Sequence, residues 1–352
     1  MINSLNNMLL KWQASYSGTI LVKQGNDILL SYSNGYAHKG FQIPITINTM
    51  FDTASVTKIF TATAILQLIE RGLLNFEDKI TDIIDLAGTK IPRDVQIVNL
   101  LNHTSGIADD ADEESGEDYA ALFIEKPNYS IRHCQDFIPQ FAYKDPYFVS
   151  GSNVRYNNCA FVLLGLAIEK IAKTDYREYI TQHIFSACNM TNSRFHAMDD
   201  VHNNVAEGYI AETDENSNFS KWRKNIYSYP PIGTADGGAY TTVGDLDIFM
   251  SAIRHNKILS QKYSNFLLSP HCVHSRPHKF GIWRTGYAFE FIENYNGEIL
   301  CMYKEGVNSG AEAMCSYYPQ QNITVNLLSN QNGCLFKIHR EIQKMLIGNL
   351  SK

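Results

Sequence analysis

Strand-like segments lie at both ends of this chain of 352 residues, and helix-like segments fill its middle. Near the N-terminus, two β-rich runs, 18–24 and 27–37, meet at Gly25-Asn26, a dipeptide typical of hairpin turns. Strand patterns return late in the chain, at 281–283, 287–292, 299–303, 313–318 and 323–328. We therefore predict one α/β body, formed by both ends of the chain around a mostly helical insertion.

The helical patterns set the bounds of this insertion. Between residues 55 and 71 the apolar side chains fall on about one helical face, and Gly72 stands where a helix C-cap is expected. Further helical patterns lie at 95–101, 161–171 and 336–346. We predict a sheet domain from residues 1–75 together with 206–352, a mostly helical domain from 76–205, and an active site in the crevice between them.

The composition excludes several functions. Acidic residues outnumber basic ones by 36 to 30, so there is no basic surplus for binding nucleic acid. The seven cysteines form no C-x-x-C pair, which predicts neither a disulfide framework nor a zinc ribbon. The N-terminus does not read as a secretory signal, and no run reaches the ~20 apolar residues that cross a bilayer. We expect a soluble cytoplasmic protein without a bound metal.

Ser55 and Lys58 form an S-x-x-K motif at the start of the first long helical pattern. The i, i+3 spacing puts the hydroxyl and the amine on one face, one turn apart. A serine nucleophile needs an adjacent proton acceptor, and lysine can act as one when burial or a neighbouring cation lowers its pKa. The N-terminus of the helix also favours an oxyanion. The alternative is an N-capping serine followed by a surface lysine, and the motif alone does not decide between them.

Three further segments follow this motif: LLNHTSGI at 100–107, RYNNCAFVLLGLAIE at 155–169 and GGAYTTVGDLDIF at 237–249. In this order, and together with FDTASVTKIFTATAILQLIERGLL at 51–74, they resemble the serine β-lactamase and penicillin-binding-protein-like hydrolases, especially the class C β-lactamase and esterase branch. The resemblance covers about residues 18–330. It implies an antiparallel sheet flanked by helices plus a mostly helical insertion, and acyl transfer that needs no metal or organic cofactor.

The resemblance assigns roles to four residues of the first two family motifs. Ser55 matches the family nucleophile, and Lys58 matches its proton-shuttling partner. Tyr156 matches the tyrosine of the Tyr-x-Asn motif and would be the general base, or a relay, at the serine. Asn158 of the same motif would hold the lysine and the substrate amide. The alternative for Tyr156 is a half-buried aromatic side chain with a satisfied hydroxyl.

The third family motif, Lys-Thr-Gly, corresponds to residues 304–306. Lys304 would supply a positive charge that favours an ionised tyrosine and a developing oxyanion, and Gly306 would let the substrate approach the backbone closely. By the same match, the backbone N–H groups of Val307 and Ser55 would form the oxyanion hole.

Glu305 departs from the family pattern, because it stands where the family has a hydroxyl that helps to bind the substrate carboxylate. A carboxylate at this position would repel such a substrate, by about 1 to 4 kcal/mol at ~4 Å. If Glu305 instead pairs with a cation or points away, this repulsion is absent. The substitution therefore puts recognition of carboxylate-bearing antibiotics in doubt.

Two other features near the motifs are polar. The acidic run DDADEESGED at 109–118 reads as a solvated loop, but in relatives this loop borders the mouth of the active site. Together with Glu305 it hints at a cationic or neutral substrate. His103 is expected to brace its loop rather than to act in catalysis, since no acidic partner is visible for it.

These observations favour a serine hydrolase that forms an acyl-enzyme on an ester, an amide or a D-amino-acid peptide. Esterase or peptidase activity ranks above β-lactamase activity because of Glu305. Two alternatives remain open. The first is a non-catalytic binding protein with the same fold, and the second is a true β-lactamase or D-Ala-D-Ala carboxypeptidase. The expected partner is a small-molecule or peptide substrate.

Overall fold

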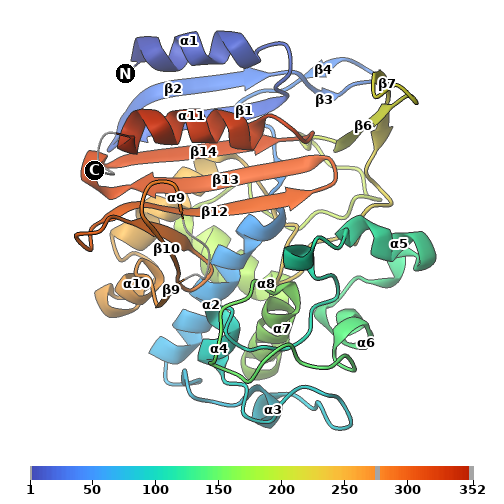
Figure 1. Cartoon of the computed structure of the whole chain (residues 1–352), viewed down its shortest axis with the longest axis vertical. Coiled ribbons are helices and arrows are strands. Elements are labelled where there is room, and N and C mark those ends of the chain that lie inside the picture. Colours follow the sequence, from blue (N-terminus) through green and yellow to red (C-terminus); the bar gives the residue numbers. More distant parts are fainter. Residues whose placement is uncertain (1, 274–277, 349–352) are drawn as a thin grey trace.

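The centre of the fold is an eight-stranded antiparallel sheet. The computed structural model describes residues 2–273 and 278–348. Its strand order is β2-β1-β14-β13-β12-β11-β10-β9 (Figure 1). The strands are β1 Gly18–Gln24, β2 Asp27–Asn34, β9 Cys272–Val273, β10 Ile282–Thr285, β11 Glu290–Glu293, β12 Ile299–Asn308, β13 Ala311–Tyr318 and β14 Ile323–Ser329. The N-terminal hairpin therefore pairs with the last strand, with Ile20 opposite Leu327.

Helices cover both faces of this sheet. α1 (Ile2–Trp12) and α11 (Leu335–Ile347) lie side by side over one face, and α9 (Val243–Arg254) packs against the other (Figure 1). The alternation of side chains along β1 matches this arrangement, because Ile20 packs in the core below α1 and α11 while Leu21 packs in the opposite core.

Beneath the sheet, α2 (Lys58–Glu70) and α7 (Asn158–Ala172) form the centre of the helical part. Both helices are apolar nearly all round and are buried accordingly. Shorter helices surround them: α3 Ile80–Ile83, α4 Ile97–Leu101, α5 Leu122–Glu125, α6 Ile138–Phe141, α8 Tyr176–Ile180 and α10 Gln261–Leu267. Within residues 2–273 and 278–348, no helix is both long enough and apolar enough to span a membrane.

Three two-stranded pairs complete the fold: β3 Tyr36–His38 with β4 Ile43–Pro44, β5 Phe51–Asp52 with β8 Tyr240–Thr241, and β6 Tyr209–Thr213 with β7 Phe219–Lys224. The second pair positions the candidate site, because it brings the chain just before Ser55 against the loop that precedes β8.

The structure confirms the predicted fold class and the N-terminal hairpin, whose Gly25 adopts a φ of +58°. The first long helix begins three residues later than the sequence pattern indicated. Ser55 lies in a 3₁₀ turn, η1 (Ala54–Thr57), and α2 begins at Lys58. The division of the chain into two domains stays a prediction.

Candidate active site

The turn that carries Ser55 is held by contacts with distant residues. Ala54 has a left-handed φ of 44°, and its N–H donates to Asp52 Oδ1 at 2.6 Å. Its carbonyl accepts from Gly238 N at 3.2 Å, and Thr57 Oγ1 accepts from Ala239 N at 2.9 Å. A left-handed alanine persists only where surrounding structure fixes it, so this turn is determined by its neighbours rather than by local propensity.

Lys58 is completely buried one turn after Ser55. Its Nζ lies 3.1 Å from Ser55 Oγ, 2.8 Å from Asn158 Oδ1, and at hydrogen-bond distance from the backbone oxygen of Asp236. Burial lowers the pKa of Lys58 to about 8, and the ammonium group of Lys304 adds to this effect. The nearby carboxylate of Asp236 opposes it. A substantial fraction of neutral amine therefore exists at mildly alkaline pH.

Tyr156 donates a hydrogen bond from its hydroxyl to Ser55 Oγ at 2.8 Å. Lys304 Nζ lies 4.6 Å from the centre of the tyrosine ring, and Lys58 Nζ lies 5.1 Å from it. Burial, together with the carboxylate of Glu113, raises the pKa of Tyr156 well above its usual value despite these cations. The phenol is therefore neutral at physiological pH.

Asn158 is the first residue of α7, and acidic side chains from the 109–118 segment fix its position. The carboxylate of Asp109 accepts from Asn158 N at 2.8 Å and from Cys159 N at 2.9 Å, which caps this end of the helix. Asn158 Nδ2 donates to Glu113 Oε1 at 3.0 Å. Because the Nδ2 end of the Asn158 amide is bound to Glu113, its Oδ1 end is directed toward Lys58 Nζ.

The first part of the acidic segment therefore contacts the candidate site, while residues 115–118 are exposed to solvent as expected of a solvated loop. Glu114 accepts a hydrogen bond from Tyr156 N at 2.8 Å, and Asp112 forms an ion pair with Arg155. Asp109, Glu113 and the backbone oxygen of Asp236 are contacts that the sequence interpretation missed. The one available signal was the position of the acidic run directly after HTSG.

β12 runs past the turn of Ser55 at very short range. A Cβ on Gly306 would lie 2.2 Å from Thr53 O and 3.0 Å from Ser55 N, so only glycine fits here. Lys304 is buried, and its Nζ lies 3.7 Å from Glu290 Oε1. Val307 follows the glycine and lines the same cavities as Ser55.

Glu305 keeps its side chain accessible to solvent at the rim of the site. Crowding by surrounding protein atoms, together with the carboxylate of Glu290, nevertheless raises the pKa of Glu305 to about 7. The residue lines the larger of two cavities that meet at Ser55. It also borders a neighbouring hollow next to Arg340 of α11.

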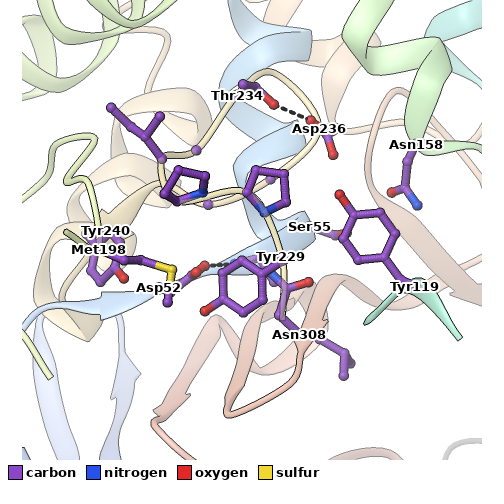
Figure 2. A pocket seen from close by; sticks show the side chains of 18 of the residues that line it. Asp52, Ser55, Tyr119, Asn158, Met198, Tyr229, Thr234, Asp236, Tyr240 and Asn308 are labelled. Atoms are coloured by element: carbon purple, nitrogen blue, oxygen red, sulfur yellow. Dashed lines mark hydrogen bonds between the residues drawn. The ribbon is translucent and has the colours of Figure 1, made fainter. Parts of the chain in front are cut away.

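The two cavities differ in size and lining. The larger, about 230 Å³, is lined by Tyr156, Lys304 and Glu305 among others. The smaller, about 40 Å³, is lined by Asp52 and Asp236 among others (Figure 2). Ser55, Glu113 and Val307 line both cavities.

His103 has the bracing contacts expected of it. Its Nδ1 accepts from Asn157 N at 3.2 Å, and its ring packs 4.7 Å from that of Tyr156.

The structure brings all eight predicted site residues together around the hydroxyl of Ser55. They are Ser55, Lys58, Tyr156, Asn158, Lys304, Glu305, Gly306 and Val307.

A family model described as Beta-lactamase matches residues 11–343. The chain belongs to the beta-lactamase family. Penicillin-binding protein 4* of Bacillus subtilis (strain 168) is 28% identical to this family member over 272 residues, which are 72% of this chain and 56% of that protein. The chain spans about half the length of the curated relatives it matches.

Solved structures agree with this assignment. A penicillin-binding protein from Bacillus halodurans is 33% identical, with a TM-score of 0.89 over 97% of this chain and 99% of that one. A D-stereospecific amidohydrolase from Streptomyces sp. has a TM-score of 0.79 at 18% identity, covering 99% of both chains, and shares the fold. The family resemblance and the β-lactamase/transpeptidase-like fold class are therefore confirmed for this beta-lactamase family member.

Proposed function

We propose that this chain is a serine hydrolase that forms an acyl-enzyme on Ser55 with an ester, an amide or a D-amino-acid peptide. The observation that carries the proposal is that Ser55 Oγ contacts both Lys58 Nζ, at 3.1 Å, and the hydroxyl of Tyr156, at 2.8 Å. A serine hydroxyl needs such partners because it is a weak nucleophile by itself.

Lys58 in its neutral form is the proton acceptor in this mechanism. A neutral amine donates its two hydrogens to Asn158 Oδ1 and to the backbone oxygen of Asp236, which leaves its lone pair for the proton of Ser55. The pKa of Lys58, lowered by burial to about 8, supports this role. Tyr156, whose pKa burial raises, donates its hydroxyl proton to the leaving group and then recovers a proton from the Lys58 ammonium, so that both groups return to their neutral forms.

The oxyanion of the tetrahedral intermediate would accept from the backbone N–H groups of Ser55 and Val307. The close contact of Gly306 with the turn of Ser55 supports this pairing, since it holds the two backbone segments at a fixed separation. Lys304 adds positive charge beside Tyr156. Water then attacks the acyl carbon while Lys58 takes one of its protons. The C(=O)–Oγ ester bond to the serine breaks, and Lys58 returns that proton to Ser55 Oγ.

Esterase or peptidase activity on neutral or cationic substrates ranks above β-lactam hydrolysis. Glu305 lines the larger cavity, where relatives of the family have a hydroxyl for the substrate carboxylate. Above the pKa of Glu305, about 7, an anionic substrate would therefore meet a carboxylate in place of a hydrogen-bond donor.

Covalent labelling tests the proposal. Incubation with p-nitrophenyl acetate or a fluorophosphonate should add one acyl or phosphonyl group, detected by intact mass, and Ser55→Ala should abolish the adduct without changing the fold. Lys58→Ala should lose most turnover because Ser55 loses its proton acceptor. Unchanged hydrolysis in either variant would contradict the mechanism, and a wild type that forms no adduct would favour a non-catalytic binding protein.

A further inference from the structure

A chain of buried polar side chains connects the two backbone segments that would form the oxyanion hole. It begins at Ser309, two residues after Val307, and ends at Ala54, the residue before Ser55. The links between these ends are three buried side chains, those of Asn225, Tyr229 and Asp52. Through them, the loop after β12 is connected to the turn that carries the candidate nucleophile.

Asn225 holds the Ser309 end of the chain. Its Nδ2 donates to Ser309 O at 2.9 Å and to the Tyr229 hydroxyl at 2.7 Å. Two glycines enclose the amide, because a Cβ on Gly208 would lie 2.0 Å from Asn225 Nδ2 and a Cβ on Gly310 would lie 3.1 Å from it. A larger residue at Gly208 would therefore displace the amide from both of its partners.

Tyr229 and Asp52 continue the chain to the turn of Ser55. The Tyr229 oxygen accepts from Asn225, and its own proton is donated to the Asp52 carboxylate. Asp52 Oδ1 in turn accepts from Ala54 N at 2.6 Å. Because Ala54 has a left-handed φ of 44°, its conformation depends on such contacts. Figure 2 shows Asp52 and Tyr229 in the wall of the smaller cavity at Ser55.

The backbone around Tyr229 has an anchor of its own. Asn128 Nδ2 donates to Ile226 O at 2.8 Å and to Tyr229 O at 2.7 Å, so the tyrosine is fixed at its backbone as well as at its hydroxyl. The close approach of Gly306 to the turn of Ser55 is a separate contact between the same two segments. Two independent contacts therefore hold the segments relative to each other.

Building on the proposed function, we propose that Asn225 and Tyr229 are positioning residues for the oxyanion hole. They hold the backbone N–H groups of Ser55 and Val307 at the separation that the tetrahedral oxyanion requires. Such donors stabilise the transition state only when both lie at hydrogen-bond distance from the developing charge, so a small displacement of one segment slows acylation. Binding of the ground-state substrate depends much less on this separation.

Pre-steady-state hydrolysis of p-nitrophenyl acetate by the full chain tests the proposal. Tyr229→Phe removes one hydroxyl and keeps the ring. It should lower the acylation rate constant at least tenfold, which corresponds to about 1.4 kcal/mol of activation free energy. The apparent dissociation constant of the ester should change much less, and the midpoint of the pH profile should stay near the pKa of Lys58, about 8, because the contacts of Lys58 are retained.

Tyr16→Phe is the matched control. The Tyr16 hydroxyl is also buried, and it bonds to the backbone oxygens of Thr19 and Leu328, each at 2.9 Å, in the core below α1 and α11. Its loss should lower the melting temperature but leave the acylation rate constant nearly unchanged. The control therefore separates positioning from general destabilisation.

Asn225→Ala provides a second variant, since it breaks the same chain at the next link. In the double variant of Asn225→Ala with Tyr229→Phe, the loss of acylation rate should be smaller than the product of the two single losses, because one intact chain cannot be broken twice. All variants are compared well below their melting temperatures.

A loss smaller than tenfold in Tyr229→Phe would overturn the proposal, and so would an equal loss in Tyr16→Phe. Single losses that multiply in the double variant would also overturn it, since they would show that the two residues act separately. Failure of the proposed function is distinguishable. In that case the wild type itself forms no adduct on Ser55, which would overturn both, whereas an active wild type with an equally fast Tyr229→Phe overturns the positioning role alone.

Discussion

The pKa of Lys58 makes a quantitative prediction about the pH dependence of acylation. If the neutral amine takes the proton of Ser55, kcat/KM for a neutral ester should rise with pH through the pKa of about 8. The active fraction is about 9% at pH 7 and about 91% at pH 9, so the rate constant should rise about tenfold over that interval. The value of kcat/KM rises rather than falls with pH because Lys58 accepts the proton of Ser55 only in its deprotonated form.

Glu113→Gln gives a direct perturbation of this profile. Burial lowers the pKa of Lys58, and the carboxylates of Asp236 and Glu113 oppose that effect. Removing the charge of Glu113 should therefore move the midpoint of the profile to lower pH and raise the relative rate at pH 7. Glu125→Gln, on the exposed surface of α5, should leave the midpoint where it is.

The assay is hydrolysis of p-nitrophenyl acetate between pH 6 and 10, corrected for the spontaneous reaction and followed under kcat/KM conditions. Pre-steady-state release of p-nitrophenol separates acylation from deacylation. A profile that is flat from pH 7 to 9, or one that falls, would refute Lys58 as the base. A midpoint in Glu113→Gln that moves to higher pH would refute the electrostatic reasoning.

Three further predictions follow from single residues. Glu305→Thr should improve acylation by a carboxylate-bearing β-lactam several-fold, which corresponds to about 1 kcal/mol of activation free energy. It should change hydrolysis of a small neutral ester much less. No gain with the β-lactam would show that Glu305 does not face the substrate. Gly306→Ala should lower both the melting temperature and the labelling rate, because its Cβ would lie 2.2 Å from Thr53 O, whereas Gly244→Ala, with no atom nearer than 3.7 Å, should do neither. Burial lowers the pKa of His339 to about 3, so the unfolded chain binds a proton at this side chain before the folded protein does. Between pH 8 and pH 5 the unfolding free energy of the wild type should therefore fall by about 2 kcal/mol on account of His339. Urea unfolding of His339→Gln should lack this loss, and equal losses in both proteins would contradict the prediction.

The candidate site residues were predictable because the family resemblance assigned them and because the spacing within each motif is short. Ser55 and Lys58 lie one turn apart, and Tyr156 and Asn158 flank the start of α7, so their spacing survives in the structure. The exact start of α2 was not predictable. Asp52 and the distant loop before β8 determine the turn around Ala54, and no local periodicity encodes such contacts.

The acidic segment shows a second limit of sequence reasoning. A run of carboxylates has the composition of a solvated loop, and its charge pattern says nothing about long-range partners. Asp109 and Glu113 nevertheless bind α7 and Asn158, because the helix start offers free N–H groups and the asparagine amide needs a second partner. Only the three-dimensional arrangement reveals these contacts.

The pairing of β1 with β14 has a consequence for how the chain acquires its structure during synthesis. Gly18 is opposite Ser329, so an interior ladder of the sheet, the second from its β2 edge, joins segments about 300 residues apart. At ribosomal rates of about 5–20 residues per second, β1 waits roughly 15–60 s for its partner to be made. Throughout that time the apolar side chains of the first hairpin have no α11 to cover them. A newly made chain should therefore depend on chaperones until translation is nearly complete, and the order of folding should run from the interior helices outward to the two ends.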